Sequence, residues 1–136
     1  MDDGVERVLK WPEGRRSEVE VQVLVLVKAT VASEAAGPPD PAMMEAMGRF
    51  NAELREAGIL RLADGLKPSS AGARVAFDGA ERAVSWGPFT PTEDLVAGFW
   101  IWEVRDLEEA IAWVKRCPNP MPVPSVIEIR PFNDRA

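Results

Sequence analysis

Glu93 and Asp94 stand side by side just before a strongly apolar segment, and they are the candidates for acid–base chemistry in this chain. Neighbouring carboxylates raise each other's pKa, which can make one of them a general acid or base. Such a base would remove a proton from a small acidic or aromatic metabolite, as an isomerase or lyase does, while Lys67 or a backbone amide stabilises the developing anion. The alternative is that both carboxylates are solvated loop charges.

Two loops, residues 64–70 and 86–94, hold the candidate ligand-binding residues. A lysine on a stiff loop can anchor an anion, hydroxyl groups can add hydrogen bonds, and tryptophan can stack on a planar ligand. The alternative is that the charges are solvent-exposed and that the tryptophan belongs to the core or to a dimer interface. The predicted ligand-binding set is Asp64, Lys67, Ser69, Trp86, Phe89 and Glu93.

The residue types that the chain lacks narrow its chemistry. It has no histidine and one cysteine, so a structural zinc site within the chain is excluded and the commonest acid–base side chain is missing. Cys117 follows a predicted helix C-terminus, where the helix dipole disfavours a thiolate, and it is a poor candidate nucleophile. We therefore expect no metal, no cofactor and no conventional catalytic site.

The chain's length and charge predict one acidic domain. Its 136 residues carry a net charge of −6, which argues against non-specific nucleic-acid binding. The apolar run Val21–Val27 is too short to span a membrane and no secretory signal is visible, so we expect a cytoplasmic protein. Residues 1–17 are predicted to be a flexible arm, with an edge strand at 5–11 as the alternative, and residues 18–136 a single domain.

The hydrophobic pattern predicts an α+β fold. Alternation predicts strands at 19–28, 59–63, 95–104 and 126–130, and a hairpin at 73–77 and 80–86 that turns at Asp78-Gly79. Capping signals at Asp40 and Asp106 predict helices over 41–57 and 107–117. This order is that of a ferredoxin-like sandwich, an antiparallel sheet with two helices on one face.

The opposite face of this sheet is expected to be apolar as well. Strand 19–28 is apolar on both sides at its centre, and residues 99–104 and 126–129 are similar. No third helix is predicted to cover that face. A second copy, packed sheet to sheet about a two-fold axis, would cover it, so we expect a homodimer.

Three segments of the chain resemble the YCII-related family, specifically its DGPF-domain branch. The resemblance covers about residues 19–132. Its motifs are Leu54-Arg55-Glu56-Ala57-Gly58-Ile59-Leu60 with Gly65-Leu66-Lys67-Pro68; Gly87-Pro88-Phe89 with Gly98-Phe99; and Asp106-Leu107-Glu108-Glu109-Ala110-Ile111-Ala112-Trp113 with Cys117-Pro118 and Ile127-Glu128-Ile129-Arg130-Pro131.

The resemblance implies a ferredoxin-like, dimeric α+β barrel whose biochemical role is largely undefined. The chain departs from the naming motif, because Trp86 stands where the family has an aspartate. A histidine–aspartate pair proposed for some relatives cannot be carried over to a chain without histidine. Members of the branch are associated with sigma-factor systems, which implies a regulatory partner. We therefore expect a ligand-binding or accessory module, with a carboxylate-based enzyme as the alternative.

Overall fold

The computed structural model of the chain describes residues 21–133, which form a four-stranded antiparallel sheet and a separate two-stranded hairpin. The predicted flexible arm at 1–17 lies outside the described residues. The elements in chain order are β1 (Val21–Lys28), α2 (Val31–Glu34), α3 (Pro41–Glu56), β2 (Leu60–Gly65), the short 3-10 helix η1 (Ser69–Ala71), β3 (Ala73–Asp78), β4 (Glu81–Trp86), the 3-10 helix η2 (Thr92–Asp94), β5 (Val96–Val104), α4 (Leu107–Arg116) and β6 (Ile127–Pro131).

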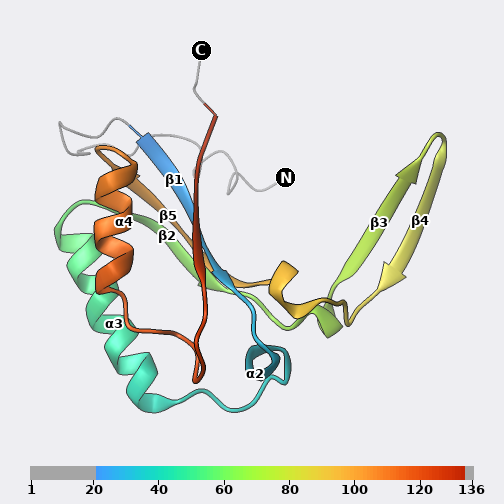
Figure 1. Ribbon diagram of the computed structural model, residues 1–136, viewed down its shortest axis with the longest axis horizontal. Helices are drawn as coiled ribbons and strands as arrows, with labels where there is room; N and C mark the ends of the chain where they lie inside the picture. The colour runs from blue at the N-terminus through green and yellow to red at the C-terminus, as the bar shows by residue number, and fades with distance from the viewer. Residues whose placement is uncertain (1–20, 134–136) are drawn as a thin grey trace.

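The main sheet has the strand order β2-β5-β1-β6, with β1 and β5 at its centre. All its pairs are antiparallel, and Val25 pairs with Trp100 on one side and with Ile129 on the other. Helices α3 and α4 lie together on one face of this sheet (Figure 1). The architecture is therefore α+β, as predicted, and the strand order is compatible with a ferredoxin-like fold.

The hydrophobic core lies between these two helices and the sheet. The alternating valines of β1 point into it, and Val23 and Val25 are fully buried there. Trp100 and Trp102 of β5 lie on the same face, where Phe50 of α3 meets both rings edge-on at about 6 Å. The period-2 pattern of β1 and β5 thus decides which side chains form the core.

Helix α3 begins and ends where its capping residues predict. Asp40 accepts a hydrogen bond from the N–H of Ala42, and Pro41 occupies the first helical position. At the other end Gly58 has a φ of 76°, a left-handed conformation that favours glycine. The N–H of Ile59 then bonds the carbonyl of Leu54 and closes the helix.

Helix α4 faces the core with only half of its predicted apolar stripe. The sequence predicts Leu107, Ala110, Ile111 and Val114 as inward positions, but Leu107 and Ile111 are 40% and 39% exposed. Ala110 is buried, and Trp113 and Val114 pack against the core. The wide ring of Trp113 reaches Phe50, with ring centroids 6.3 Å apart.

Segment 29–39, which the sequence predicts to be a loop, contains the single-turn helix α2. A reciprocal capping box holds it: Thr30 Oγ1 accepts from the N–H of Ser33, and the Ser33 hydroxyl accepts from the N–H of Thr30. The segment has no apolar periodicity, so only the pair of hydroxyl side chains could have indicated this turn.

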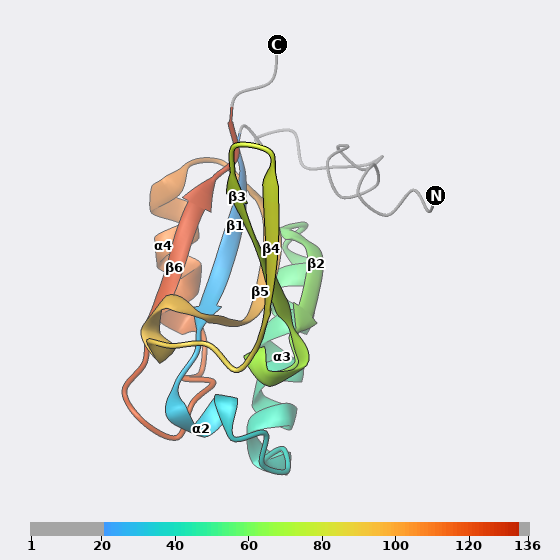
Figure 2. The ribbon, with the colours of Figure 1, turned by 90° about the vertical axis from the view of Figure 1, so that its right-hand side faces the viewer.

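The β3–β4 hairpin leaves the body of the domain as a long arm. Figure 1 shows it diverging from the sheet, and in Figure 2 it stands in front of the sheet while α3 and α4 lie behind. It therefore projects on the side of the sheet that carries no helix. Gly79 at its tip has a φ of 59°, in agreement with the predicted turn, and every residue of both strands is exposed. We call this hairpin the β3–β4 arm.

No helix in the described part of the chain is long and apolar enough to cross a membrane.

Candidate functional site

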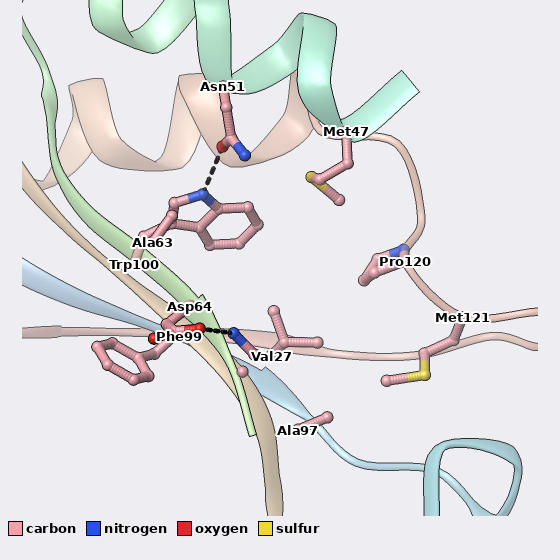
Figure 3. Close-up of a pocket in the computed structure, with 12 residues that line it drawn as sticks. Val27, Met47, Asn51, Ala63, Asp64, Ala97, Phe99, Trp100, Pro120 and Met121 are labelled. Carbon is pink, nitrogen blue, oxygen red and sulfur yellow. Dashed lines mark hydrogen bonds between the residues drawn. The ribbon is translucent and has the colours of Figure 1, made fainter. Parts of the chain in front are cut away.

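A cavity of about 470 Å³ opens between α3, the ends of β2 and β5, and the loop that precedes β6. This is within the size range of sites for small organic molecules. Figure 3 shows Asn51 and Met47 of α3 on one side of the cavity and Pro120 and Met121 of the loop on another. The remaining lining residues are Val27, Ala63, Asp64, Gly65, Ala97, Gly98, Phe99 and Trp100.

The cavity exists because small residues meet where β2 and β5 pair. Ala63, Gly65, Ala97 and Gly98 leave room that larger side chains would fill. At Gly98 an added Cβ would lie 3.1 Å from the carbonyl oxygen of Asp64, tighter than ordinary contact. Glycine at this position lets the two strands approach closely and leaves their core-side face hollow.

The polar feature of the cavity wall is a hydrogen bond between α3 and β5. The Nε1–H of Trp100 donates to Oδ1 of Asn51 at 2.8 Å, and Trp100 is only 4% exposed. This bond fixes the orientation of the Asn51 amide, because its oxygen must face the indole. In Figure 3 the amide nitrogen lies on the side of Met47 and Pro120, so its N–H groups are directed toward the cavity.

The loop before β6, which is held by its own hydrogen bonds, forms the opposite wall of the cavity. Oδ1 of Asn119 accepts from the N–H of Met121 and from the hydroxyl of Ser125, while Nδ2 of the same residue donates to the carbonyl of Val123. The Thr30 hydroxyl donates to the sulfur of Met121 at 3.2 Å. Asn119 thus shapes the proline-rich segment and sets Met121 at the mouth of the cavity.

The cavity lining carries no positive charge. None of the described residues that line it is basic, and the one acidic residue among them, Asp64, pairs with Phe99 and therefore shares the helix-free face of the sheet with it. Oδ1 of Asp64 accepts a hydrogen bond from the N–H of Gly65 at 2.9 Å. The lining combines aliphatic and thioether groups, which favour apolar and aromatic ligands, with one amide that can donate.

A second polar cluster lies at the base of the β3–β4 arm. The carboxylate of Glu34 in α2 accepts from both the N–H and the hydroxyl of Ser69, and the Ser69 oxygen accepts from the N–H of Phe89 at 3.0 Å. These bonds from Ser69 lower the pKa of Glu34 below its ordinary value of 4.5. The cluster joins α2, η1 and the segment after β4, so its role is to anchor the arm.

Gly87, which follows β4, makes a second contact at the base of the β3–β4 arm. Its N–H donates to the carbonyl of Gly72 at 3.0 Å, and a Cβ at this position would lie 1.7 Å from the carbonyl oxygen of Ser69. No side chain fits there. The ring of Phe89 lies beneath the guanidinium of Arg74, 4.1 Å from its centroid. The Gly-Pro-Phe segment is therefore the packed joint between the arm and the domain.

The predicted ligand-binding residues do not gather in one place. Ser69 and Phe89 meet at the base of the arm, and Asp64 lies at the cavity. Lys67 is exposed, and Trp86 is on the arm with 76% of its surface accessible. Neither Lys67 nor Trp86 is among the residues of the cavity lining.

The candidate acid–base pair lies apart from the cavity. Glu93 and Asp94 are both exposed in η2 and are not part of its lining. Cys117 is half-buried at the C-terminal end of α4, and burial raises the pKa of its thiol to about 11, which keeps it protonated at neutral pH.

Sequence reasoning missed Asn51, Met47 and Met121. Met47 belongs to the apolar stripe of α3 by its spacing, and nothing in the local pattern marks Asn51 or Met121 as neighbours of Trp100. One signal was present: the small pair Ala97-Gly98 inside an otherwise bulky strand, which marks missing side-chain volume in a buried sheet.

Two comparisons relate this chain to known proteins. The family model described as the YCII-related domain matches residues 21–133. An uncharacterised protein of Rhizobium meliloti (strain 1021) is 28% identical over 93 residues, which cover 68% of this chain and 75% of the relative. Neither comparison names a reaction or a ligand.

Proposed function

We propose that this chain, which belongs to the YCII-related domain family of uncharacterised function, is a binding module. Its cavity would hold a small, uncharged, largely apolar molecule. The observation that carries the proposal is the hydrogen bond from Trp100 to Asn51 at the wall of the 470 Å³ cavity. That bond leaves one oriented amide donor in an otherwise apolar surface, as is usual in small-molecule sites.

The charge of the lining supports an uncharged ligand. An anion would find no basic partner among the described lining residues. A carbonyl or ether oxygen would suit the Asn51 amide, and an aromatic ring would suit the sulfur atoms of Met47 and Met121. We therefore infer a flat, neutral ligand with one hydrogen-bond acceptor.

We also assign the chain to the DGPF-domain branch of the family. The close packing at Gly87, where no side chain fits, supports this. Trp86, at the position of the motif aspartate, points outward on the arm, and its exposure explains how a different side chain fits there without disturbing the joint.

Titration with a matched pair of probes tests the ligand class. Benzamide and benzoate have the same ring, but only benzamide is neutral. In ¹H–¹⁵N NMR spectra we expect benzamide at millimolar concentration to shift the signals of the Trp100 indole N–H and the Asn51 amide, and benzoate to shift them much less. Equal or stronger binding of benzoate would overturn the ligand class.

Two variants locate the site. Ala63→Leu fills the cavity and is expected to abolish the benzamide shifts, whereas Ala52→Leu, an exposed position one residue from Asn51 and outside the lining, should leave them unchanged. If neither benzamide nor any member of a neutral fragment library shifts the Trp100 indole signal, the cavity is not a ligand site and the proposal fails.

A further inference from the structure

Helix α2 connects the mouth of the cavity to the base of the β3–β4 arm. At its N-terminal end the hydroxyl of Thr30 donates to the sulfur of Met121, which lines the cavity, at 3.2 Å. At its C-terminal end the carboxylate of Glu34 accepts from the N–H and the hydroxyl of Ser69. Figures 1 and 2 both show α2 between the loop before β6 and the base of the arm. One turn of helix therefore contacts both places.

The contact at Ser69 continues into the arm. Its hydroxyl oxygen accepts from the N–H of Phe89 at 3.0 Å, and its carbonyl oxygen occupies the place that a side chain at Gly87 would need. Because the backbone is packed this closely at Gly87, a displacement of Ser69 must also displace the segment that follows β4.

Helix α2 is built to move as one unit. None of its four residues is buried, so core packing does not hold it, while the capping box between Thr30 and Ser33 stiffens its single turn. Directly before it Ala29 is buried, and the N–H of Ala29 donates to the carbonyl of Leu95 at 3.0 Å. Residues 35–40 after it are exposed. The helix is therefore a short lever that is fixed at Ala29.

We propose that α2 couples the cavity to the arm, so that a ligand in contact with Met121 loosens the attachment of the arm; this inference rests on the proposed ligand-binding function. An aromatic ring packed on the thioether competes with the Thr30 hydroxyl for the sulfur atom. Loss of that hydrogen bond lets α2 turn about Ala29, which weakens the bonds between Glu34 and Ser69. The ligand and the firm attachment of the arm thus oppose each other, and this opposition is reciprocal.

The coupling has a consequence because the arm carries an exposed apolar face. The strand pairing places Val75 opposite Val84 and Ala73 opposite Trp86 on this face, and Val84 and Trp86 are 55% and 76% exposed. The two strands are paired along their whole length, so the arm turns as one body when its base changes. Occupancy of the cavity therefore sets the position of an apolar surface.

Titration with benzamide, followed in ¹H–¹⁵N NMR spectra, tests the coupling. In the wild type we expect the amide signals of Gly87 and Phe89, which lie outside the cavity lining, to shift with the same concentration dependence as the Trp100 indole signal. In Glu34→Ala the arm is already released, so those two shifts should be lost and the Trp100 shift should saturate at a benzamide concentration at least about fivefold lower. Glu45→Ala, at an exposed position of α3, is the matched control and should behave as the wild type.

The outcomes separate the coupling from the ligand-binding function. A Trp100 shift without shifts at Gly87 and Phe89 would overturn the coupling and leave the function intact. Equal benzamide affinity of Glu34→Ala and the wild type would also overturn it, because coupled sites must affect each other. Absence of a Trp100 shift at any benzamide concentration would count against the function itself.

Hydrogen exchange in the absence of ligand tests the link through α2 directly. Met121→Ala removes the sulfur that Thr30 bonds, and we expect the Phe89 N–H to exchange at least about fivefold faster relative to the amides of β1. Met44→Ala, at a methionine of α3 that is 60% exposed and outside the cavity lining, should leave this ratio unchanged. An unchanged ratio in Met121→Ala, or the same increase in Met44→Ala, would overturn the proposal whether or not benzamide binds.

Discussion

Trp100 of β5 and Asn51 of α3 are joined by a side-chain hydrogen bond of 2.8 Å that connects the centre of the sheet to the first helix packed upon it. The bond also gives the cavity its one oriented amide. Because the same contact serves the fold and the candidate site, substitutions at Asn51 are expected to affect both, and the two effects can be measured separately.

Asn51→Leu is expected to lower the free energy of unfolding by about 1–3 kcal/mol. The Trp100 Nε1–H is buried and would lose its acceptor. Urea denaturation measures the change, and a double-mutant cycle with Trp100→Phe isolates the hydrogen bond, because Asn51→Leu should cost less when the indole is absent. Equal costs in both backgrounds would show that the bond does not contribute to stability.

Gly87→Ala and Gly48→Ala should change stability in opposite directions. At Gly87 the new methyl group would overlap the carbonyl oxygen of Ser69, so the base of the β3–β4 arm must open, and a loss of about 1–3 kcal/mol is expected. Gly48 lies in α3 with open space around it, where alanine should stabilise the helix by about 0.5–1 kcal/mol. Urea midpoints of the two variants give the comparison.

The bonds between Glu34 and Ser69 should make stability depend on acid pH. The pKa of Glu34 is lowered in the folded chain, so this contribution is present above the unfolded value of 4.5 and is lost as the pH falls through the lower folded value. Ser69→Ala should therefore destabilise the protein more at neutral pH than at strongly acidic pH, where the bond to the N–H of Phe89 is lost but the bond to the Glu34 carboxylate no longer contributes. Ser70→Ala, at the exposed neighbouring position, serves as the control, and a pH-independent effect of Ser69→Ala would contradict this assignment.

Cys117 should react slowly with thiol reagents in the folded protein. Burial raises the pKa of its thiol to about 11, so the thiolate fraction at pH 8 is far below that of a free cysteine. Iodoacetamide labelling followed by mass spectrometry is expected to accelerate strongly in urea. Rapid labelling without denaturant would show that the thiol is more accessible and more acidic than this packing implies.

Local patterns in the sequence predicted the main elements, because each one rests on neighbouring residues. The alternating valines of β1 predicted a strand, without deciding which of its two apolar faces the helices cover, and Asp40-Pro41 and Gly58 marked the ends of α3. The Asp78-Gly79 turn and the Gly-Pro break similarly indicated the hairpin. The two helices on one face of an antiparallel sheet followed from the order of these elements.

The candidate cavity could not be read from the same patterns. Its wall joins Asn51, Trp100 and Met121, which are far apart in the chain and come together only through the strand register and the packing of α3. The predicted loops 64–70 and 86–94 do approach each other, through Ser69 and Phe89, but that contact anchors the arm. A sequence shows that two loops are polar, and it does not show whether their side chains face a cavity or each other.

The sequence by itself determined the main strands and the two long helices and the acidic, histidine-free chemistry, because those follow from residue type and spacing along the chain. Only the tertiary structure decided that small residues leave a cavity where β2 meets β5, and that the hairpin stands away from the sheet with an apolar face uncovered. Both depend on how distant segments pack, since the volume left between elements and the direction of a projecting hairpin are properties of the assembled fold.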